Sequence, residues 1–339
     1  MAAVVEAKPN ESAAELLVFN LGSHTTTVET SNKSSPPKPM FIVSPIEQGS
    51  YPVILFFPDT CISNNAYSQL FQHISSHGFI VVSPQLYSCM PPCGNNEVDF
   101  AAQVTNWLPK GLKSNLPENV EADLNKLVLS GHSRGGTIAF ALSLGYACKT
   151  RLDQFSALVA VDPVGGTTKC TELNPSILSN NPFNLSFPVT VIGTGLGGVT
   201  KCIIPCAPES ANHEKFYERS KAPKAHFVTK EYGHMVVLDD SSSNLRSWVM
   251  SKCMCAKGKG PREAMRRTVG GIAVAFLKDL FSGNLKNGVF MKIVQDPSVA
   301  PAVLDDVDFV QARNYVDFGL PVLWGKIQGR PFHDLYSIN

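Results

Sequence analysis

Ser133 lies between two glycine-containing arms in the stretch "LVLSGHSRGGTIAF", residues 127–140. Gly131 and Gly135 complete the pattern G-x-S-x-G between an apolar run and a helical stretch, which is typical of a nucleophile elbow. That turn is so tight that a side chain at either glycine would strike the neighbouring strand or helix. We therefore predict a strained Ser133 with its hydroxyl held at the mouth of the site, and a backbone N–H of Arg134 directed at the oxyanion formed on attack. The alternative is a glycine-rich turn without chemistry.

A serine hydroxyl is a poor nucleophile until a base removes its proton, and histidine is the usual base. Of the eight histidines, His234 in "EYGHMVVLDD" directly follows the last expected strand, so we predict that it is the base. His73 and His77 are four residues apart on an expected helix, which favours surface or packing roles. His132 lies inside the elbow, and its side chain is expected to point elsewhere.

The histidine needs a carboxylate that fixes its tautomer, and the chain order serine, acid, histidine restricts this acid to residues 134–233. The loop after the expected strand 188–192 is the commonest place, but "GTGLGGVTK" contains no carboxylate. One strand earlier, "ALVAVDPVGG" puts Asp162 at a strand end, and we predict that Asp162 is the acid. The alternative is a turn-initiating Asp-Pro pair. The other carboxylates lie before that strand, in a loop or in a polar helix: Asp153, Glu172, Glu209 and Glu214.

A second oxyanion donor usually comes from the loop after an early strand, which here reads "FFPDTC". The backbone N–H of Thr60 or Cys61 is the candidate. Pro58-Asp59 stands where hydrolases commonly have His-Gly, and aspartate can adopt the left-handed conformation that glycine would provide, at some cost. A carboxylate here would oppose the developing oxyanion unless it turns away.

The stretch "GTGLGG", residues 193–198, follows a strand and matches the dinucleotide pattern G-x-G-x-x-G. A dinucleotide site also needs a helix that begins at once and holds the pyrophosphate at its N-terminus. Pro205 and Pro208 in the following residues oppose a regular helix. The sequence therefore argues against a nicotinamide or flavin site, and we expect no organic cofactor.

The nine cysteines include a C-x3-C pair, Cys202 and Cys206, and a C-x-C pair, Cys253 and Cys255. Such pairs suggest zinc, but no histidine is spaced around them as a zinc finger requires, and the two pairs belong to different loops. We therefore favour buried thiols or a disulfide, and expect no metal.

The elements that must position these residues are read from the hydrophobic pattern. Helical stretches at 66–77, 97–108, 135–147 and 261–281 lie among short apolar runs that are continuous rather than alternating, as in strands buried on both faces of a parallel sheet. The alternation predicts an α/β fold with a doubly wound, mostly parallel sheet and right-handed crossovers, with ligands at the carboxyl ends of its strands. The runs are 51–57, 79–83, 126–130, 156–161, 188–192 and 225–229.

The composition excludes several classes of protein. The 29 basic and 28 acidic residues nearly cancel, so no long-range field indicates nucleic acid. The sequence contains no run of 18 apolar residues, so it predicts no transmembrane helix. The N-terminus lacks the features of a secretory or transit signal, which favours an intracellular protein. We expect residues 1–39 to be a flexible, polar lead-in and residues 40–339 to be a single domain.

Beyond single motifs, the chain from about residue 40 onward resembles the plant chlorophyllases, a family of the α/β-hydrolase superfamily. The segments that carry the resemblance are "SHGFIVVSPQLY", "GHSRGGTIAFALSL", "VDPVGG", "NHEKFYERS", "YGHMVVLDD" and "MRRTVGGIAVAFL". The resemblance implies an α/β-hydrolase fold and a Ser-Asp-His esterase that cleaves the phytyl ester of chlorophyll to chlorophyllide and phytol. Pro58-Asp59 departs from the family's usual His-Gly pair.

A substrate of this kind would need an apolar groove, because a phytyl tail gains roughly 0.8 kcal/mol for each buried methylene. Met235, Phe216 and Tyr217 are the expected lining, whereas the helix 261–281 is expected to be core. Chlorophyll as substrate implies a chloroplast location and peripheral contact with pigment-bearing membranes, with the cytosol as the alternative. Two other functions fit the same residues: a general carboxylesterase or lipase, and a non-catalytic ligand-binding protein on a hydrolase fold.

Overall fold

The computed structural model describes residues 18–30, 33–89, 96–147, 155–166, 172–179, 182–201, 205–240, 255–305 and 307–311. They form one nine-stranded sheet with the order β1-β2-β4-β3-β5-β6-β7-β8-β9. The strands from β4 to β8 in that order are parallel, and β1, β2 and β9 join antiparallel at the two edges. The strands are Thr26–Glu29 (β1), Met40–Pro45 (β2), Gly49–Phe57 (β3), Ile80–Pro84 (β4), Val120–His132 (β5), Phe155–Val161 (β6), Val189–Thr194 (β7), Lys224–Thr229 (β8) and Asp308–Val310 (β9).

The six parallel strands coincide with the six apolar runs of the sequence, which confirms the predicted α/β class. Every residue of β4 and of β7 is buried, because helices cover both faces of the sheet. The antiparallel strands were not predicted. β1 is a polar, partly exposed edge and β9 has three residues, whereas β2 is six residues long and fully buried.

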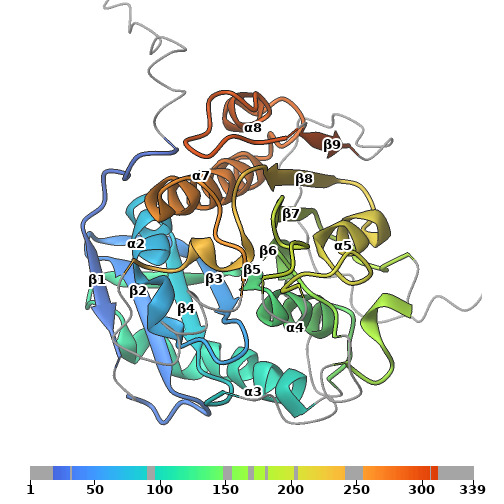
Figure 1. Ribbon diagram of the computed structural model, residues 1–339. Coiled ribbons are helices and arrows are strands. Elements are labelled where there is room, and N and C mark those ends of the chain that lie inside the picture. Colours follow the sequence, from blue (N-terminus) through green and yellow to red (C-terminus); the bar gives the residue numbers. More distant parts are fainter. Residues whose placement is uncertain are drawn as a thin grey trace, which may run out of the picture.

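Helices cover the two faces of the sheet in two groups (Figure 1). α2 and α7 lie together on one face with α8 beyond α7, and α3, α4 and α5 lie on the other face. α2, α3, α4 and α7 match the predicted helical stretches, α5 corresponds to the short polar helix expected around Glu214, and α8 was not predicted. Glu214 lies in α5 as expected for a polar helix, but Glu209 precedes it. The helices are Ser68–Ser76 (α2), Asn96–Gly111 (α3), Arg134–Ser143 (α4), His213–Arg219 (α5), Arg262–Phe281 (α7) and Val289–Val294 (α8).

The sheet separates two hydrophobic cores. One core joins α2 and α7 to one face of the strands, and Phe276 of α7 is fully packed there with Phe71 of α2 and Phe56 of β3. Burial of a phenylalanine of this kind contributes about 1.5–3 kcal/mol. The helix 261–281 is therefore core, as predicted. The second core joins α3, α4 and α5 to the opposite face, so the central strands are held from both sides.

The expected lead-in at residues 1–39 is wrong for residues 18–30. Val18 and Phe19 are completely buried, and the carbonyl of Val18 accepts a hydrogen bond of 2.8 Å from Nε2 of His73 on α2. β1 then pairs with β2, so this segment belongs to the fold. Sequence reasoning missed it because a polar edge strand has no apolar run. The contact confirms the packing role expected for His73. Residues 1–17 and 31–32 lie outside the described part.

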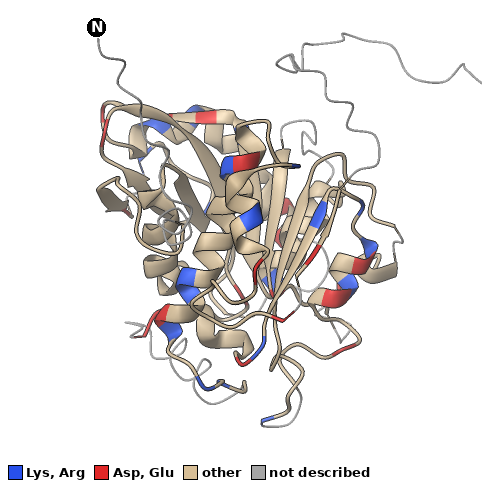
Figure 2. Ribbon diagram, turned by 90° about the horizontal axis from the view of Figure 1, so that it is seen from above, with Lys and Arg blue, Asp and Glu red and all other residues tan. Residues whose placement is uncertain are grey.

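Charged residues are spread over the surface of the ribbon, with basic and acidic positions interspersed (Figure 2). This distribution agrees with the near-zero net charge of the sequence, +1 with neutral histidines. Within the described part of the chain, no helix combines the length and the apolar composition that crossing a bilayer requires.

Candidate active site

β5 ends in the predicted elbow, and α4 begins at the next residue after Ser133. Ser133 has φ 55° and ψ −121°, a conformation in which non-glycine residues are strained. The sharp turn is possible because a side chain at Gly131 would overlap the backbone of Gly135, and one at Gly135 would overlap the carbonyl of Phe57. A hydrogen bond of 2.9 Å from the N–H of Ser133 to the carbonyl of Val161 holds the turn against β6. Both the strain and the steric role of the glycines were predicted.

The three predicted side chains meet at the carboxyl ends of the strands. Nε2 of His234 lies 2.8 Å from Oγ of Ser133, and Nδ1 of His234 lies 2.7 Å from Oδ2 of Asp162. His234 begins a 3₁₀ turn, His234–Val237, which follows β8, and Asp162 follows β6. Ser133, Asp162 and His234 are 6%, 0% and 2% exposed, so water does not compete for these hydrogen bonds. The arrangement has the geometry of a serine–histidine–acid relay.

Asp162 is held by more than the histidine. Its Oδ2 also accepts a hydrogen bond of 2.5 Å from Oγ1 of Thr194 on β7, and its Oδ1 accepts one of 3.3 Å from the N–H of Thr194. Burial raises the pKa of Asp162, but the hydrogen bond and charge of His234, followed by His213 and Thr194, outweigh burial and bring the pKa to about 2. The carboxyl is therefore ionised at neutral pH. Thr194 is the last residue of β7, within the stretch "GTGLGGVTK" that lacked a carboxylate, and it was not predicted.

His234 keeps an affinity for protons despite its burial. Burial lowers the pKa of His234, but the hydrogen bond and charge of Asp162 and the charge of Asp59 together raise it above the ordinary histidine value. The carboxylate of Asp162 also fixes the tautomer, since Nδ1 must carry the proton that it donates. Nε2 is then unprotonated and accepts from the hydroxyl of Ser133. This is the protonation state that a general base requires.

His132, expected to point elsewhere, lies against the site instead. Its ring is 4.7 Å from that of His234, and its Nε2 donates a 2.9 Å hydrogen bond to the carbonyl of His234. Its Nδ1 accepts a 2.9 Å hydrogen bond from the hydroxyl of Tyr67, and that oxygen accepts the N–H of Asp59 at 3.1 Å. A continuous chain of hydrogen bonds thus joins the turn of His234 to the loop after β3. No periodicity or motif marks Tyr67 for this role.

Arg134 occupies the first position of α4, where backbone N–H groups point out of the helix N-terminus and favour negative charge. Its side chain points into the protein and is 4% exposed. The guanidinium forms a buried ion pair with Glu97 of α3, with a 2.8 Å bond between Nε and Oε1. This pair ties the start of α4 to α3 and so fixes the N–H that was predicted to meet the oxyanion.

The loop after β3 differs from the prediction in two ways. The N–H of Cys61 donates to the carbonyl of Cys89 at 3.0 Å, and the two cysteines form a disulfide, so Cys61 is wrong as an oxyanion donor. The left-handed residue is Cys61, with φ 60°, and not Asp59. The N–H of Thr60 donates to the side chain of Asp59 at 2.6 Å, so Asp59 has not turned away.

The residues expected to line a substrate groove are packed in the interior instead. Phe216 is completely buried on α5 between Phe140 and Phe183. Tyr217 stacks on His226 with 4.6 Å between ring centroids, and Met235 is 3% exposed in the core that contains α7. The expectation was wrong because apolar character alone does not separate a groove from a core.

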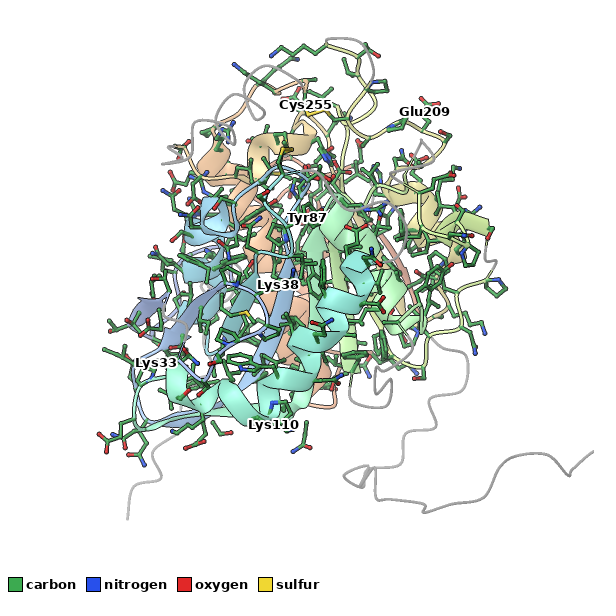
Figure 3. The ribbon with its side chains drawn as sticks, turned by 90° about the horizontal axis from the view of Figure 1, so that it is seen from below. Lys33, Lys38, Tyr87, Lys110, Glu209 and Cys255 are labelled. Atoms are coloured by element: carbon green, nitrogen blue, oxygen red, sulfur yellow. A yellow bond between two sulfur atoms is a disulfide. The ribbon has the colours of Figure 1, made fainter. Side chains whose placement is uncertain are left out.

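The cysteine and glycine motifs have structural roles. Cys206 and Cys255 form a disulfide, which fits the predicted alternative to zinc, whereas Cys202 and Cys253 lie outside the described residues. The bridge lies on the side of the molecule where Cys255 is labelled in Figure 3. After β7, residues 195–201 form turns rather than a helix, so the dinucleotide arrangement is missing there. The described residues contain no group of three or more His, Cys, Asp or Glu side chains suited to a metal ion.

Comparison with known proteins gives a consistent result over most of the chain. The family model described as Chlorophyllase matches residues 14–311, further toward the N-terminus than the segments that suggested it. Chlorophyllase-1, chloroplastic, of Citrus unshiu is 52% identical, with 93% of this chain and 97% of that protein covered. Chlorophyllase-1 of Arabidopsis thaliana is 45% identical (90% and 96%), and chlorophyllase type 0 of Chenopodium album is 43% identical (86% and 84%). The chain therefore belongs to the chlorophyllase family.

Proposed function

We propose that this protein is a serine esterase that hydrolyses the phytyl ester of chlorophyll, with Ser133 as nucleophile, His234 as base and Asp162 as the acid that orients it. The observation that carries the proposal is the position of His234, within hydrogen-bonding distance of both partners. Membership of the family supports a carboxylic ester hydrolysis, and the name chlorophyllase that the relatives carry supports chlorophyll as the substrate. The intact relay disfavours a non-catalytic ligand-binding protein.

The first half of the reaction transfers the acyl group to the enzyme. Nε2 of His234 takes the hydroxyl proton while Oγ of Ser133 attacks the propionate ester carbonyl of the pigment. The negative oxygen that develops is stabilised by the N–H of Arg134 at the start of α4 and by the N–H of Thr60. Asp162 stabilises the imidazolium that forms. Collapse of the intermediate passes the proton from His234 to the departing phytol.

The second half releases the acid. A water molecule in the position vacated by phytol gives a proton to Nε2 of His234 and attacks the acyl group on Ser133. Collapse of this second intermediate frees the carboxylic acid, chlorophyllide, and returns the proton to Oγ of Ser133. The magnesium ion belongs to the substrate, and apart from the attacking water the steps above use side chains and backbone groups of this chain.

The relatives also support a location. Two Citrus proteins that are 52% identical to this chain are named chloroplastic, so we propose that this protein acts in the chloroplast. A twenty-carbon tail partitions into membranes, so peripheral contact with pigment-bearing membranes is part of the proposal.

The test is chromatography of chlorophyll after incubation with the purified protein or with its Ser133→Ala variant. The native protein should give chlorophyllide and phytol, and the variant should lose at least about 10⁴-fold in turnover. Ser143→Ala is a matched control, because Ser143 lies on the same helix and its hydroxyl donates to the carbonyl of Phe140, away from the site. Hydrolysis of a short p-nitrophenyl ester several-hundredfold faster than chlorophyll would indicate a general carboxylesterase instead.

A further inference from the structure

The carboxylate of Asp59 lies within the candidate active site. Its Oδ1 accepts the N–H of Thr60 at 2.6 Å, and its Oδ2 lies 3.7 Å from Nε2 of His234. The same nitrogen is 2.8 Å from Oγ of Ser133. The residue is 7% exposed, so bulk water screens its charge only weakly. Asp59 therefore spans the space between the second oxyanion donor and the base.

The backbone around Asp59 is held in place, and a small pocket lies beside the residue. The carbonyls of Phe57 and Pro58 lie against Gly135 of the elbow, and the N–H of Asp59 donates to the hydroxyl of Tyr67 at 3.1 Å. A small pocket adjoins the carboxylate on the side of Tyr87, which lies beside α4 (Figure 3). Because the backbone is fixed, the carboxylate leaves the N–H of Thr60 only if the side chain rotates. The pocket is lined by Pro58, Asp59, Gln85, Leu86, Tyr87 and Ile138.

This position conflicts with the chemistry of the site. Attack by Ser133 creates a negative oxygen that needs the N–H of Thr60, and the carboxylate of Asp59 already accepts that hydrogen bond. Two negative oxygens in a buried site also repel each other more strongly than they would in water. The carbonyl of the ester can reach the N–H of Thr60 only after Asp59 has left it.

We propose that Asp59 is an occluding residue, whose carboxylate fills the oxyanion hole of the resting enzyme and limits hydrolysis until it rotates away. The inference rests on the proposed function only in that Ser133 is taken as the nucleophile of an esterase. It concerns the rate of the reaction with any ester and is independent of the identity of that ester.

Asp59 also affects the base. His234 is faced by Asp162 after β6, by His132 at the end of β5 and by Asp59 after β3. Burial lowers the pKa of His234, Asp162 raises it, and the charge of Asp59 adds to the rise. Because His234 must be neutral to act as a base, a raised pKa places the acid limb of the activity at higher pH. Removal of the charge of Asp59 should move that limb to lower pH.

The experiment uses Asp59→Ala, which removes the carboxylate, and Asp59→Asn, which keeps its shape but not its charge. Two rates are measured at pH 8: kcat/KM for p-nitrophenyl butyrate, and inactivation by a p-nitrophenyl alkylphosphonate, which leaves a charged tetrahedral group on Ser133. Asp59→Ala should raise both rates at least about tenfold, and at most by the roughly 10²–10³-fold that one oxyanion donor contributes. Asp59→Asn should give a smaller rise, because its amide oxygen still accepts from Thr60, together with an acid limb at lower pH.

Asp305→Ala is the control, since Asp305 is a partly exposed aspartate that pairs with Lys230, and its rates should match those of the native protein. Circular dichroism and Tm check folding. If Asp59→Ala does not fold, the two rates of the nearly isosteric Asp59→Asn variant test the proposal. Equal or lower rates in the folded variants would overturn the proposal, wherever the acid limb lies. Chlorophyll hydrolysis by the native protein is measured separately, so loss of the chlorophyll assignment would leave this result intact.

Discussion

The hydroxyl of Tyr67 donates a 2.9 Å hydrogen bond to Nδ1 of His132, and this bond links two loops of the active site. The direction follows from the other side of the ring, where Nε2 of His132 must donate to the carbonyl of His234. Burial and the charge of His234 bring the pKa of His132 to about 4, so the ring is neutral and Nδ1 is an acceptor. These hydrogen bonds thereby fix the turn that carries His234 relative to the loop that carries Asp59.

Tyr67→Phe should therefore lower kcat about tenfold with little change in KM. The substitution leaves Nδ1 of His132 and the N–H of Asp59 without their shared partner, which costs about 1–3 kcal/mol and loosens both loops. Steady-state kinetics and Tm check this. Tyr51→Phe is a matched control, because it also removes one hydroxyl, which bonds to the carbonyl of Glu47. Equal kinetic effects of the two substitutions would contradict a positioning role for Tyr67.

Asp162→Asn should reduce kcat by about 10⁴-fold while the fold is kept. An amide in place of the carboxylate can donate to Nδ1 and so stabilise the wrong tautomer of His234.

Thr194→Val should lower kcat far less, about tenfold or below, because the N–H of Thr194 remains bonded to Asp162. Thr190→Val on the same strand is the control, since its buried hydroxyl has no hydrogen-bond partner among the described residues. A loss in Thr190→Val as large as that in Thr194→Val would speak against this role of Thr194.

The pH dependence of kcat/KM should have its acid limb above pH 6.5, the ordinary pKa of histidine. The net effect of burial, Asp162 and Asp59 is to raise the pKa of His234, so its neutral form is present above that pKa and is lost as the pH falls through it. Asp162, with a pKa of about 2, stays ionised throughout this range. Initial rates between pH 5 and 9 measure the limb, and a midpoint below 6.5 would contradict the assignment.

Removal of the Cys61–Cys89 bridge should lower both stability and activity. The bridge closes a loop with a sequence separation of 28 residues, which in the chain-entropy model contributes about 3.6 kcal/mol. It also anchors the loop that carries Thr60, so Cys61→Ser combined with Cys89→Ser should reduce kcat. The pair Cys206→Ser and Cys255→Ser is the comparison, with a similar loss of stability and a smaller loss of kcat. Denaturant unfolding and p-nitrophenyl ester kinetics distinguish the two bridges.

The sequence alone was sufficient to identify the elbow and the three residues of the relay. Ser133, Asp162 and His234 each follow a continuous apolar run, and the carboxyl ends of parallel strands meet at one edge of a sheet. Local pattern and topology therefore agree, and the site follows from their combination. The glycines could also be assigned, because the need for space at an elbow is a local steric property.

Tertiary structure decided the features that depend on contacts between distant segments. Tyr67 and His132 are 65 residues apart in the sequence, and the residues around neither of them predict this hydrogen bond. The burial of Phe216 and the pairing of β1 with β2 likewise depend on what packs against them rather than on their own residue types. The orientation of Asp59 toward Thr60 and His234 belongs to the same class. Side-chain direction and pairing over long distances are set by packing, whereas the positions of the reactive groups along the chain are set by local pattern.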